Sequence, residues 1–387
     1  RLQKRLLTPL LAGAMLAGCV DLDLTNPSQR TADTFFNNRD DAFAALIASY
    51  HGLQELGAFG RWLVFADDVR SDIATSRSPW TDLANFTKTV VSGYNFEVNI
   101  HLYQHNYWTI GAANQVIQRV PAIEMNATER DAFVAEAKFI RALSYFNLVT
   151  LFGNVPLITE PQQAGTLPPA ATPEAIWAQI EQDLTEAIPD LPPRYNSDNV
   201  GRVTSWAAKA LLGKAHLQQR EWDLAATQFA DVIANGPFEL VDDYGDNFRA
   251  DRENNIESIF EVQFTDDQVL SQGSAGYSAP KLYGPCGPAF CDANPTEWYF
   301  DQFFVETPGT PDPRLDYTIF YNKPGGMDVF GVPFAERYDD RLDDKFVKKY
   351  TQWYAGRADE QFDNPTNFKV LRLGGVLLMH AEALNEG

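Results

Sequence analysis

The chain has 387 residues, of which 52 are acidic and 31 are Lys or Arg, and its formal net charge is −21 at pH 7. This acidity argues against nucleic acid as a partner and against electrostatic docking on anionic lipid. The length is sufficient for one large domain or two smaller ones.

The N-terminus has the pattern of an export signal. Arg1, Lys4 and Arg5 give a positively charged segment, and the largely apolar stretch 6–16 follows. Because a membrane-spanning helix needs roughly 20 apolar residues, a stretch of about half that length indicates a signal peptide instead. We therefore expect residues 1–18 to be a cleaved leader.

The leader ends in Leu16-Ala17-Gly18-Cys19, which resembles the lipobox of bacterial lipoproteins. Small residues before the cysteine fit a narrow peptidase cleft, and the thiol of Cys19 accepts diacylglycerol. A buried cysteine in an ordinary secretory signal is the alternative, but four matching positions favour the lipobox. We expect Cys19 to be lipidated, with acyl chains such as palmitate holding the protein at a membrane, and residues 19–33 to form an extended tether.

Helical periodicity begins near Thr34 and dominates the chain up to about residue 237. Thr128, with Asp131 three residues later, has the spacing of a capping box and predicts a helix up to about Phe152. Thr172 followed by Pro173 predicts a second helix start. We expect helical pairs over three ranges: about 102–152, 173–237 and 370–387.

The segment 204–236 is typical of a tetratricopeptide-like (TPR-like) helix pair. Small residues there allow two antiparallel helices to approach closely, and one aromatic ring fills the gap between them. Five positions match the repeat pattern, namely Leu212, Gly213, Ala225, Phe229 and Pro237. Because such pairs bury their faces against neighbouring pairs, one of them implies others. The fold class expected is mostly α, a TPR-like scaffold.

Residues 238–368 lose the helical period and are interrupted by Gly, Pro, Asn and Asp. We interpret this range as a loop-rich insertion with short strands and helices, a kind of segment that often carries function. Within it, Cys286 and Cys291 are separated by four residues, and in an exported protein this spacing favours a disulfide over a zinc site. The helical pattern returns at Val370 and stops at Gly387, so the chain is expected to be truncated inside a helical pair.

Taken together, these segments resemble the SusD/RagB family of nutrient-uptake lipoproteins. The most specific stretch is 136–157, with Arg141-Ala, Tyr145-Phe, Phe152-Gly and Val155-Pro-Leu in the family's order. Four further stretches are similar to family patterns: 206–248, 255–264, 312–315 and 371–386. The resemblance covers essentially the whole mature chain, although family members normally continue beyond this end.

The resemblance implies a protein without catalytic activity or cofactor, placed as a lid on a SusC-like TonB-dependent transporter in the outer membrane. It implies an oligosaccharide or another nutrient as ligand, with ligand-contacting residues in the loop after the first helix and in the insertion. The expected location is the outer membrane, by lipid anchor and with surface exposure.

Motifs for catalysis or metal binding are scarce. His101 and His105 share a helical face, but without an evident third ligand we favour a helix-surface or interhelical role. Carboxylate pairs such as Asp67-Asp68 are expected by chance among 52 acidic residues. The turn 242–247 offers oxygen ligands for a structural calcium ion, although a solvated turn is the stronger interpretation. We predict no metal site.

Aromatic residues in loops are the remaining signal, because sugars stack their C–H faces on rings and bond their hydroxyls to polar groups at the rim. Trp80, flanked by Arg77 and Asn85, ranks first. Around the predicted disulfide, a second group consists of Tyr283, Trp298 and Tyr299. We expect these two regions to form the walls of one cleft.

The leading hypothesis is therefore a surface-exposed lipoprotein that binds an oligosaccharide and delivers it to a transporter. A TPR-like scaffold whose main ligand is protein or peptide is the alternative. A glycoside hydrolase is a weaker one.

Overall fold

The computed structural model describes residues 35–387 apart from 78, 86–96, 163–164, 267–275 and 308. The expected leader, the tether and Cys19 lie outside the described residues. The chain divides into an N-terminal unit ending at Asn37 and a large unit, Asn38–Gly387, to which all elements below belong. Within the described residues, no helix combines the length and apolarity needed to cross a membrane.

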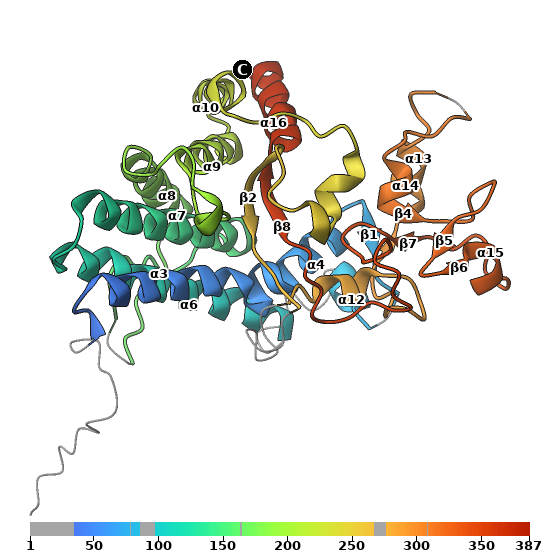
Figure 1. Cartoon of the computed structure of the whole chain (residues 1–387), viewed down its shortest axis with the longest axis horizontal. Helices are drawn as coiled ribbons and strands as arrows, with labels where there is room; N and C mark the ends of the chain where they lie inside the picture. The colour runs from blue at the N-terminus through green and yellow to red at the C-terminus, as the bar shows by residue number, and fades with distance from the viewer. Residues whose placement is uncertain (1–34, 78, 86–96, 163–164, 267–275, 308) are drawn as a thin grey trace, which may run out of the picture. The chain divides into compact units, whose positions relative to one another are not determined.

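The first half of the large unit is a series of helices in which each packs against the next (Figure 1). The series consists of α3 (Arg39–Gln54), α6 (Glu97–Arg119), α7 (Ala127–Phe152), α8 (Pro173–Ala187), α9 (Ser205–Gln218) and α10 (Trp222–Asn235). This arrangement confirms the mostly helical, TPR-like fold class. In the α9–α10 hairpin, a Cβ placed on Gly213 would lie 2.6 Å from a ring carbon of Phe229, so the small residue permits the close approach.

Side chains cap the N-termini of helices α7 and α8. The Thr172 hydroxyl accepts a hydrogen bond from Ala175 N at the start of α8, as the sequence predicts. For α7 the predicted cap is wrong. The helix starts at Ala127, and the Asn126 side chain accepts from Glu129 N, so Thr128 already lies inside the first turn.

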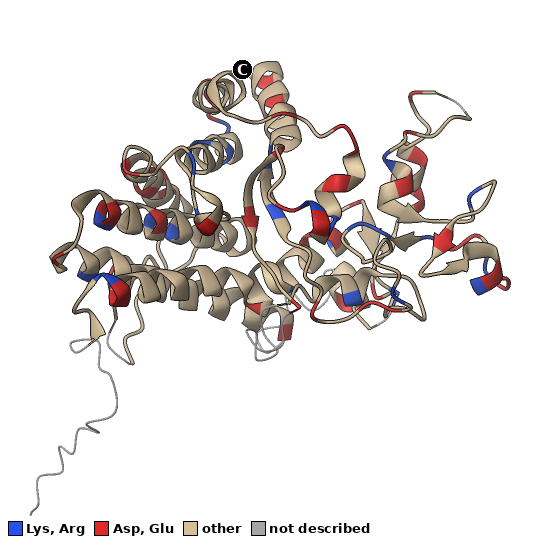
Figure 2. Ribbon diagram, in the orientation of Figure 1, with Lys and Arg blue, Asp and Glu red and all other residues tan. Residues whose placement is uncertain are grey.

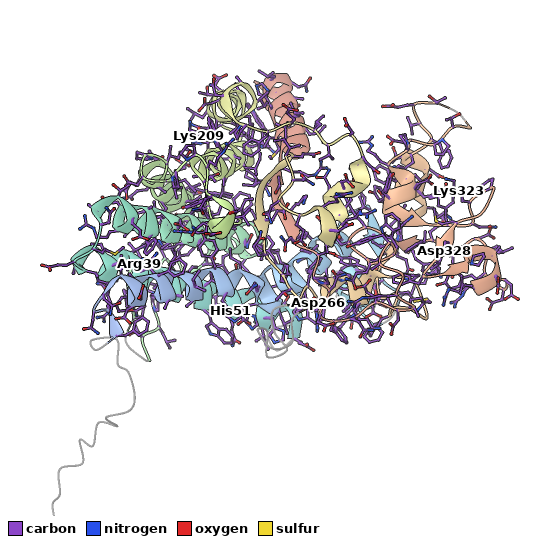
Figure 3. The ribbon with its side chains drawn as sticks, viewed as in Figure 1. Arg39, His51, Lys209, Asp266, Lys323 and Asp328 are labelled. Atoms are coloured by element: carbon purple, nitrogen blue, oxygen red, sulfur yellow. A yellow bond between two sulfur atoms is a disulfide. The ribbon has the colours of Figure 1, made fainter. Side chains whose placement is uncertain are left out.

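Buried ion pairs join the helices to one another. The guanidinium of Arg141 in α7 donates to both carboxylate oxygens of Asp183 in α8, at 2.8 and 2.6 Å. Buried Glu136 of α7 accepts hydrogen bonds from Arg202, Tyr50 and Tyr195. Partly exposed pairs also occur, and Lys209, which is labelled in Figure 3, reaches Asp231 across the α9–α10 hairpin.

Three elements lie between the helical series and the insertion (Figure 1). The helix α4 (Trp62–Val69) follows the π-helical turn η1 (Leu56–Gly60). The strands β2 (Ser258–Val262) and β8 (Phe368–Arg372) pair antiparallel and pack against α9. The predicted helix start at Val370 is therefore wrong. The final helix, α16 (Leu373–Glu386), begins after β8 and packs against α10.

The remainder of the insertion consists of short elements. Residues 315–346 surround a small core of their own, which includes Leu315, Phe320, Phe334 and Phe346, whereas Leu282 and Tyr283 belong to the main core. The helices of the insertion are α12 (Ala279–Tyr283), α13 (Glu297–Gln302), α14 (Leu315–Thr318) and α15 (Phe334–Arg337). Its strands are β3 (Asn294–Pro295), β4 (Ile319–Phe320), β5 (Asp328–Val329), β6 (Val332–Pro333) and β7 (Phe346–Val347). Acidic and basic side chains are interspersed over both the helices and this region (Figure 2).

Candidate functional site

The two regions expected as walls of one cleft lie side by side. The segment after α4 forms strand β1 (Ala74–Thr75), which pairs antiparallel with β3 of the insertion. Two bonds from Thr296 reinforce the junction, one from its backbone N to the carbonyl of Ile73 and one from its hydroxyl to the carbonyl of Asp72, at 3.0 and 2.6 Å. The short helix α5 (Thr81–Ala84) follows β1 and carries the predicted group around Trp80.

A cavity of about 210 Å³ lies beside this junction, between α4, α12, α13 and the strands β4, β7 and β8. We call it the tyrosine cavity, because Tyr283, Tyr299 and Tyr350 line it. Two charged side chains also line it, Asp68 from α4 and Lys349 from the segment after β7. The rest of the lining is largely aliphatic, so the cavity combines ring faces with one acidic and one basic group.

The polar groups of the cavity are oriented by contacts. The Tyr283 hydroxyl donates to Asp68 Oδ2 at 2.8 Å. Burial raises the pKa of Asp68, whereas the Tyr283 hydrogen bond and the charge of Lys349 act to lower it. The Lys349 ammonium lies 4.6 Å from the ring centre of Phe248, a cation–π contact that fixes its position. Burial also raises the pKa of Tyr299 to about 12, so its hydroxyl stays protonated and can donate at neutral pH.

Trp80 lies on the other side of Phe65 from this cavity. Its ring packs against Trp62 at 4.9 Å and Phe65 at 6.1 Å, and Phe65 contacts Tyr283 in turn at 5.5 Å. The Trp80 Nε1–H donates to Asp292 at 3.1 Å. Trp80 is thus half-buried against the core. An indole beside apolar α4 residues gains more from packing than its polar sequence neighbours suggest.

A chain of contacts leads from the buried Trp62 ring to aromatic rings at the protein surface. The Arg61 guanidinium lies 5.4 Å from the Trp62 ring and 4.9 Å from that of Phe362. Phe362 packs edge-to-face on Phe290 at 5.6 Å, and these two side chains are 45% and 52% exposed. We call Trp80, Arg61, Phe290 and Phe362 the aromatic surface, and it was not predicted beyond Trp80.

Only some of the predicted ligand residues line the tyrosine cavity. Tyr283 and Tyr299 are brought together in the cavity, although Tyr283 is only 3% exposed and forms part of its wall. Trp298, which is 52% exposed, lies on α13 outside the cavity lining. Arg77 and Asn85 are exposed near the two ends of α5 and do not line the cavity.

Other predicted features have local roles. Cys286 and Cys291, with Cα atoms 4.8 Å apart, are joined by a disulfide in the loop that follows α12. His105 is buried and its Nδ1 accepts from Gly57 N at 3.1 Å, which is an interhelical role. In the turn 242–247, the Asp243 carboxylate accepts from Gly245 N and the Asn247 amide donates to Glu257.

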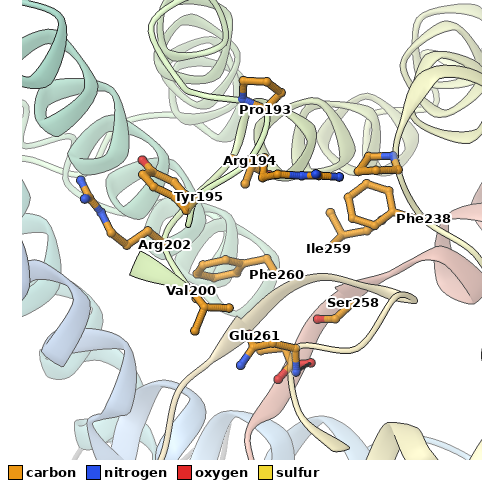
Figure 4. Close-up of a pocket in the computed structure, with 14 residues that line it drawn as sticks. Pro193, Arg194, Tyr195, Val200, Arg202, Phe238, Ser258, Ile259, Phe260 and Glu261 are labelled. Carbon is orange, nitrogen blue, oxygen red and sulfur yellow. Dashed lines mark hydrogen bonds between the residues drawn. The ribbon is translucent and has the colours of Figure 1, made fainter. Parts of the chain in front are cut away.

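A second cavity, of about 170 Å³, lies between the segment 193–204 and β2 (Figure 4). Tyr195 and Arg202 line it, and both donate to the buried carboxylate of Glu136. Because these polar groups are already used to hold α7 in place, we assign them a structural role.

This chain is similar to known proteins in sequence and in structure. Residues 22–217 match the SusD-like family described as starch-binding and associating with outer membrane. SusD-like protein P25 of Formosa agariphila is 27% identical over 268 residues, which is 65% of this chain and half of the relative's length. A SusD superfamily protein from Bacteroides vulgatus has a TM-score of 0.79 and 26% identity, covering 92% of this chain and 77% of that one.

A structure described as a laminarin-binding SusD-like protein has a TM-score of 0.75 and 27% identity, covering 90% of this chain and 81% of that one. The family match spans half of this chain, and the structural likeness covers about nine tenths of it. The chain therefore belongs to the SusD-like family.

Proposed function

We propose that this protein is a lipid-anchored carbohydrate-binding protein of the cell surface. In this proposal, it holds part of an oligosaccharide in the tyrosine cavity and delivers the ligand to a TonB-dependent transporter of the outer membrane. The lipid is attached at Cys19. The observation that carries the proposal is the meeting of ring faces, Asp68 and Lys349 in one cavity where the two expected walls join. The family description and the laminarin-binding relative support a carbohydrate as the ligand.

The chemistry of the cavity suits a sugar. The half-buried ring of Tyr299 offers a face on which sugar C–H groups can stack, and Asp68 offers an acceptor for a pair of hydroxyl groups. The Lys349 ammonium offers hydrogen-bond donors for sugar oxygen atoms. Because these groups are held by existing contacts, little side-chain entropy is lost when a ligand binds.

In this proposal the protein binds the oligosaccharide and cleaves no bond in it. Glycoside hydrolysis generally uses a pair of carboxyl groups about 5–10 Å apart on either side of the scissile bond. Among the described residues that line the tyrosine cavity, Asp68 is the one carboxylate. The cavity therefore supports recognition rather than acid–base catalysis.

The test is isothermal titration calorimetry with laminarin-derived and starch-derived oligosaccharides. We expect Tyr299→Ala and Asp68→Asn each to weaken binding by about tenfold or more, since about 1.4 kcal/mol corresponds to a factor of ten. Trp298→Ala is the matched control, because this neighbouring ring lies outside the cavity, and it should bind as the wild type does.

Two results would contradict the proposal in different ways. If Trp80→Ala abolishes binding while Tyr299→Ala does not, the ligand lies on the aromatic surface and the assignment to the cavity is wrong. If no carbohydrate binds the wild-type protein, the alternative of a protein or peptide ligand replaces the proposed function.

A further inference from the structure

Three side chains of types that can bind a metal lie close together where helix α8 meets the α9–α10 hairpin. They are Glu181 in the middle of α8, His216 in the last turn of α9, and Glu221 immediately before α10. One ring nitrogen of the histidine and one oxygen of each carboxylate all lie within 4.8 Å of one another. This group shares no residue with the lining of the tyrosine cavity and plays no part in the proposed carbohydrate binding.

The hairpin turn creates this arrangement. Arg220 adopts a positive φ of 62°, which turns the chain sharply after α9. The Glu221 backbone N then donates to the carbonyl of His216 at 2.9 Å, so the two side chains are brought to the same end of the hairpin. Because α8 packs against α9, a carboxylate oxygen of Glu181 comes within 4.8 Å of a ring nitrogen of His216.

An ordinary ion pair accounts for only part of the cluster. His216 Nδ1 lies 2.5 Å from Glu221 Oε2, and the imidazole is only 7% exposed. Glu181, however, receives a neutral donor, the Gln219 side-chain amide at 2.6 Å. Among the described residues, no lysine or arginine nitrogen lies within 4.0 Å of either carboxylate. Glu181 therefore lies beside the His216–Glu221 pair without an ion pair of its own, and no lysine or arginine offsets the negative charge of the two carboxylates.

A divalent cation would neutralise this charge. Imidazole nitrogen combined with carboxylate oxygen suits zinc and neighbouring transition metals, whereas calcium and magnesium prefer oxygen ligands alone. Three protein ligands and one water complete the tetrahedral geometry that zinc adopts. We propose that Glu181, His216 and Glu221 bind a divalent transition metal, with Zn²⁺ the best fit, and that the ion fastens α8 to the α9–α10 hairpin.

The test uses the purified, untagged protein after treatment with a chelator, titrated with ZnCl₂ by calorimetry. We expect one equivalent to bind, and Zn²⁺ to raise the melting temperature. His216→Gln and Glu181→Gln should each weaken binding at least tenfold. Glu181→Gln is the safer variant, because glutamine has nearly the same shape and is equally suited to a helix.

His51→Gln is the matched control. His51 is also a helical histidine with a carboxylate neighbour, its Nε2 lying 3.7 Å from Glu55. This variant should bind zinc as the wild type does. The proposal is wrong if the wild type binds no zinc, or if Glu181→Gln and His216→Gln bind it with unchanged affinity; in either case the cluster is a histidine–glutamate ion pair only.

Discussion

The Tyr283 hydroxyl donates a hydrogen bond of 2.8 Å to Asp68 Oδ2, and this bond joins α12 of the insertion to α4 across the wall of the tyrosine cavity. Burial raises the pKa of Asp68, which means that the folded protein disfavours its ionised form. The Tyr283 hydrogen bond offsets part of this cost, because a hydroxyl donor stabilises the carboxylate more than the neutral acid.

We therefore expect Tyr283→Phe to lower the free energy of unfolding by about 1–3 kcal/mol at a pH where Asp68 is ionised, since it leaves a charged acceptor with one donor fewer. The loss should shrink as the pH falls through the pKa of Asp68 and the carboxyl group becomes protonated. Urea denaturation at several pH values measures this. In the Asp68→Asn background, Tyr283→Phe should have an effect that does not change with pH. A pH-dependent effect there would mean that another group is responsible.

The buried pair formed by Arg141 and Asp183 gives a structural role to the arginine of the stretch 136–157. Arg141 donates to Asp183, to the Asn114 side chain and to the carbonyl of Thr159, and both charged residues are almost fully buried. A single arginine thus connects α7 with α6, α8 and the segment after α7.

Replacing Arg141 by methionine should destabilise the protein by about 3–5 kcal/mol, because Asp183 would remain buried without its partner. The double variant Arg141→Met/Asp183→Leu should recover part of that loss, since it removes the uncompensated charge. Guanidinium denaturation of the three proteins measures both effects. Lys209→Ala, which breaks the partly exposed pair with Asp231, is the control and should cost no more than about 1 kcal/mol. A double variant less stable than Arg141→Met would contradict this account.

The helical half of the fold could be predicted from the sequence because its signals are local. A capping threonine before Pro173 and the small Gly213 opposite Phe229 act within one helix or one hairpin, so the spacing of residues is sufficient. In contrast, α4 has five of its eight residues buried, and a segment enclosed on most sides shows no polar face from which a helical period can be recognised. Strand β8 depends on β2, more than a hundred residues earlier, and this pairing overrides the helical pattern at Val370.

The candidate site could be predicted only in outline. The sequence indicated the two regions and two of the tyrosines, Tyr283 and Tyr299. Asp68 carries no distinctive signal because acidic pairs are common in so acidic a chain, and nothing near Lys349 marks it. These two charges are almost three hundred residues apart, and only the packing of the insertion against α4 brings them into one cavity. The contact of Trp80 with the core also has no signal in the sequence, because its neighbours along the chain are mostly polar.

Glu360 gives a prediction about pH. Its side chain is fully buried and accepts from Gln352 N and the Asn364 amide, both at 2.7 Å. Burial raises its pKa from 4.5 to about 7. Because the pKa is higher in the folded state, the protonated form favours folding. The stabilisation is complete below pH 4.5 and is lost as the pH rises to about 7.

At about 1.36 kcal/mol per pKa unit, that difference corresponds to about 3 kcal/mol. We expect the free energy of unfolding of the wild type, relative to Glu360→Gln, to fall by up to this amount between pH 4.5 and pH 8. Any constant effect of the substitution cancels in this comparison. Glu336→Gln, at an exposed position of α15, is the control and should follow the wild type. If the difference between wild type and Glu360→Gln does not change with pH, Glu360 does not titrate in this range.

Two glycines in helices give opposite predictions for the same substitution. In an exposed helix interior, alanine is favoured over glycine by about 0.8–1 kcal/mol. Gly111 in α6 has no atom within 4 Å of the place where a Cβ would lie, so Gly111→Ala should raise stability by about this amount. Gly213 in α9 is different, since a Cβ there would lie 2.6 and 2.9 Å from two ring carbons of Phe229.

The Phe229 ring is fully buried between α9 and α10, so it cannot move aside into solvent. Gly213→Ala should therefore lower stability by about 1–3 kcal/mol despite the better helix propensity, because the two helices must separate to admit the methyl group. Thermal and urea denaturation of both variants measure the contrast. Gly213→Ala/Phe229→Leu should be more stable than Phe229→Leu alone if the clash is the cause, since the smaller side chain leaves room for the methyl group. If Gly213→Ala stabilises the protein as Gly111→Ala does, the close approach of α9 and α10 is not the reason for glycine at this position.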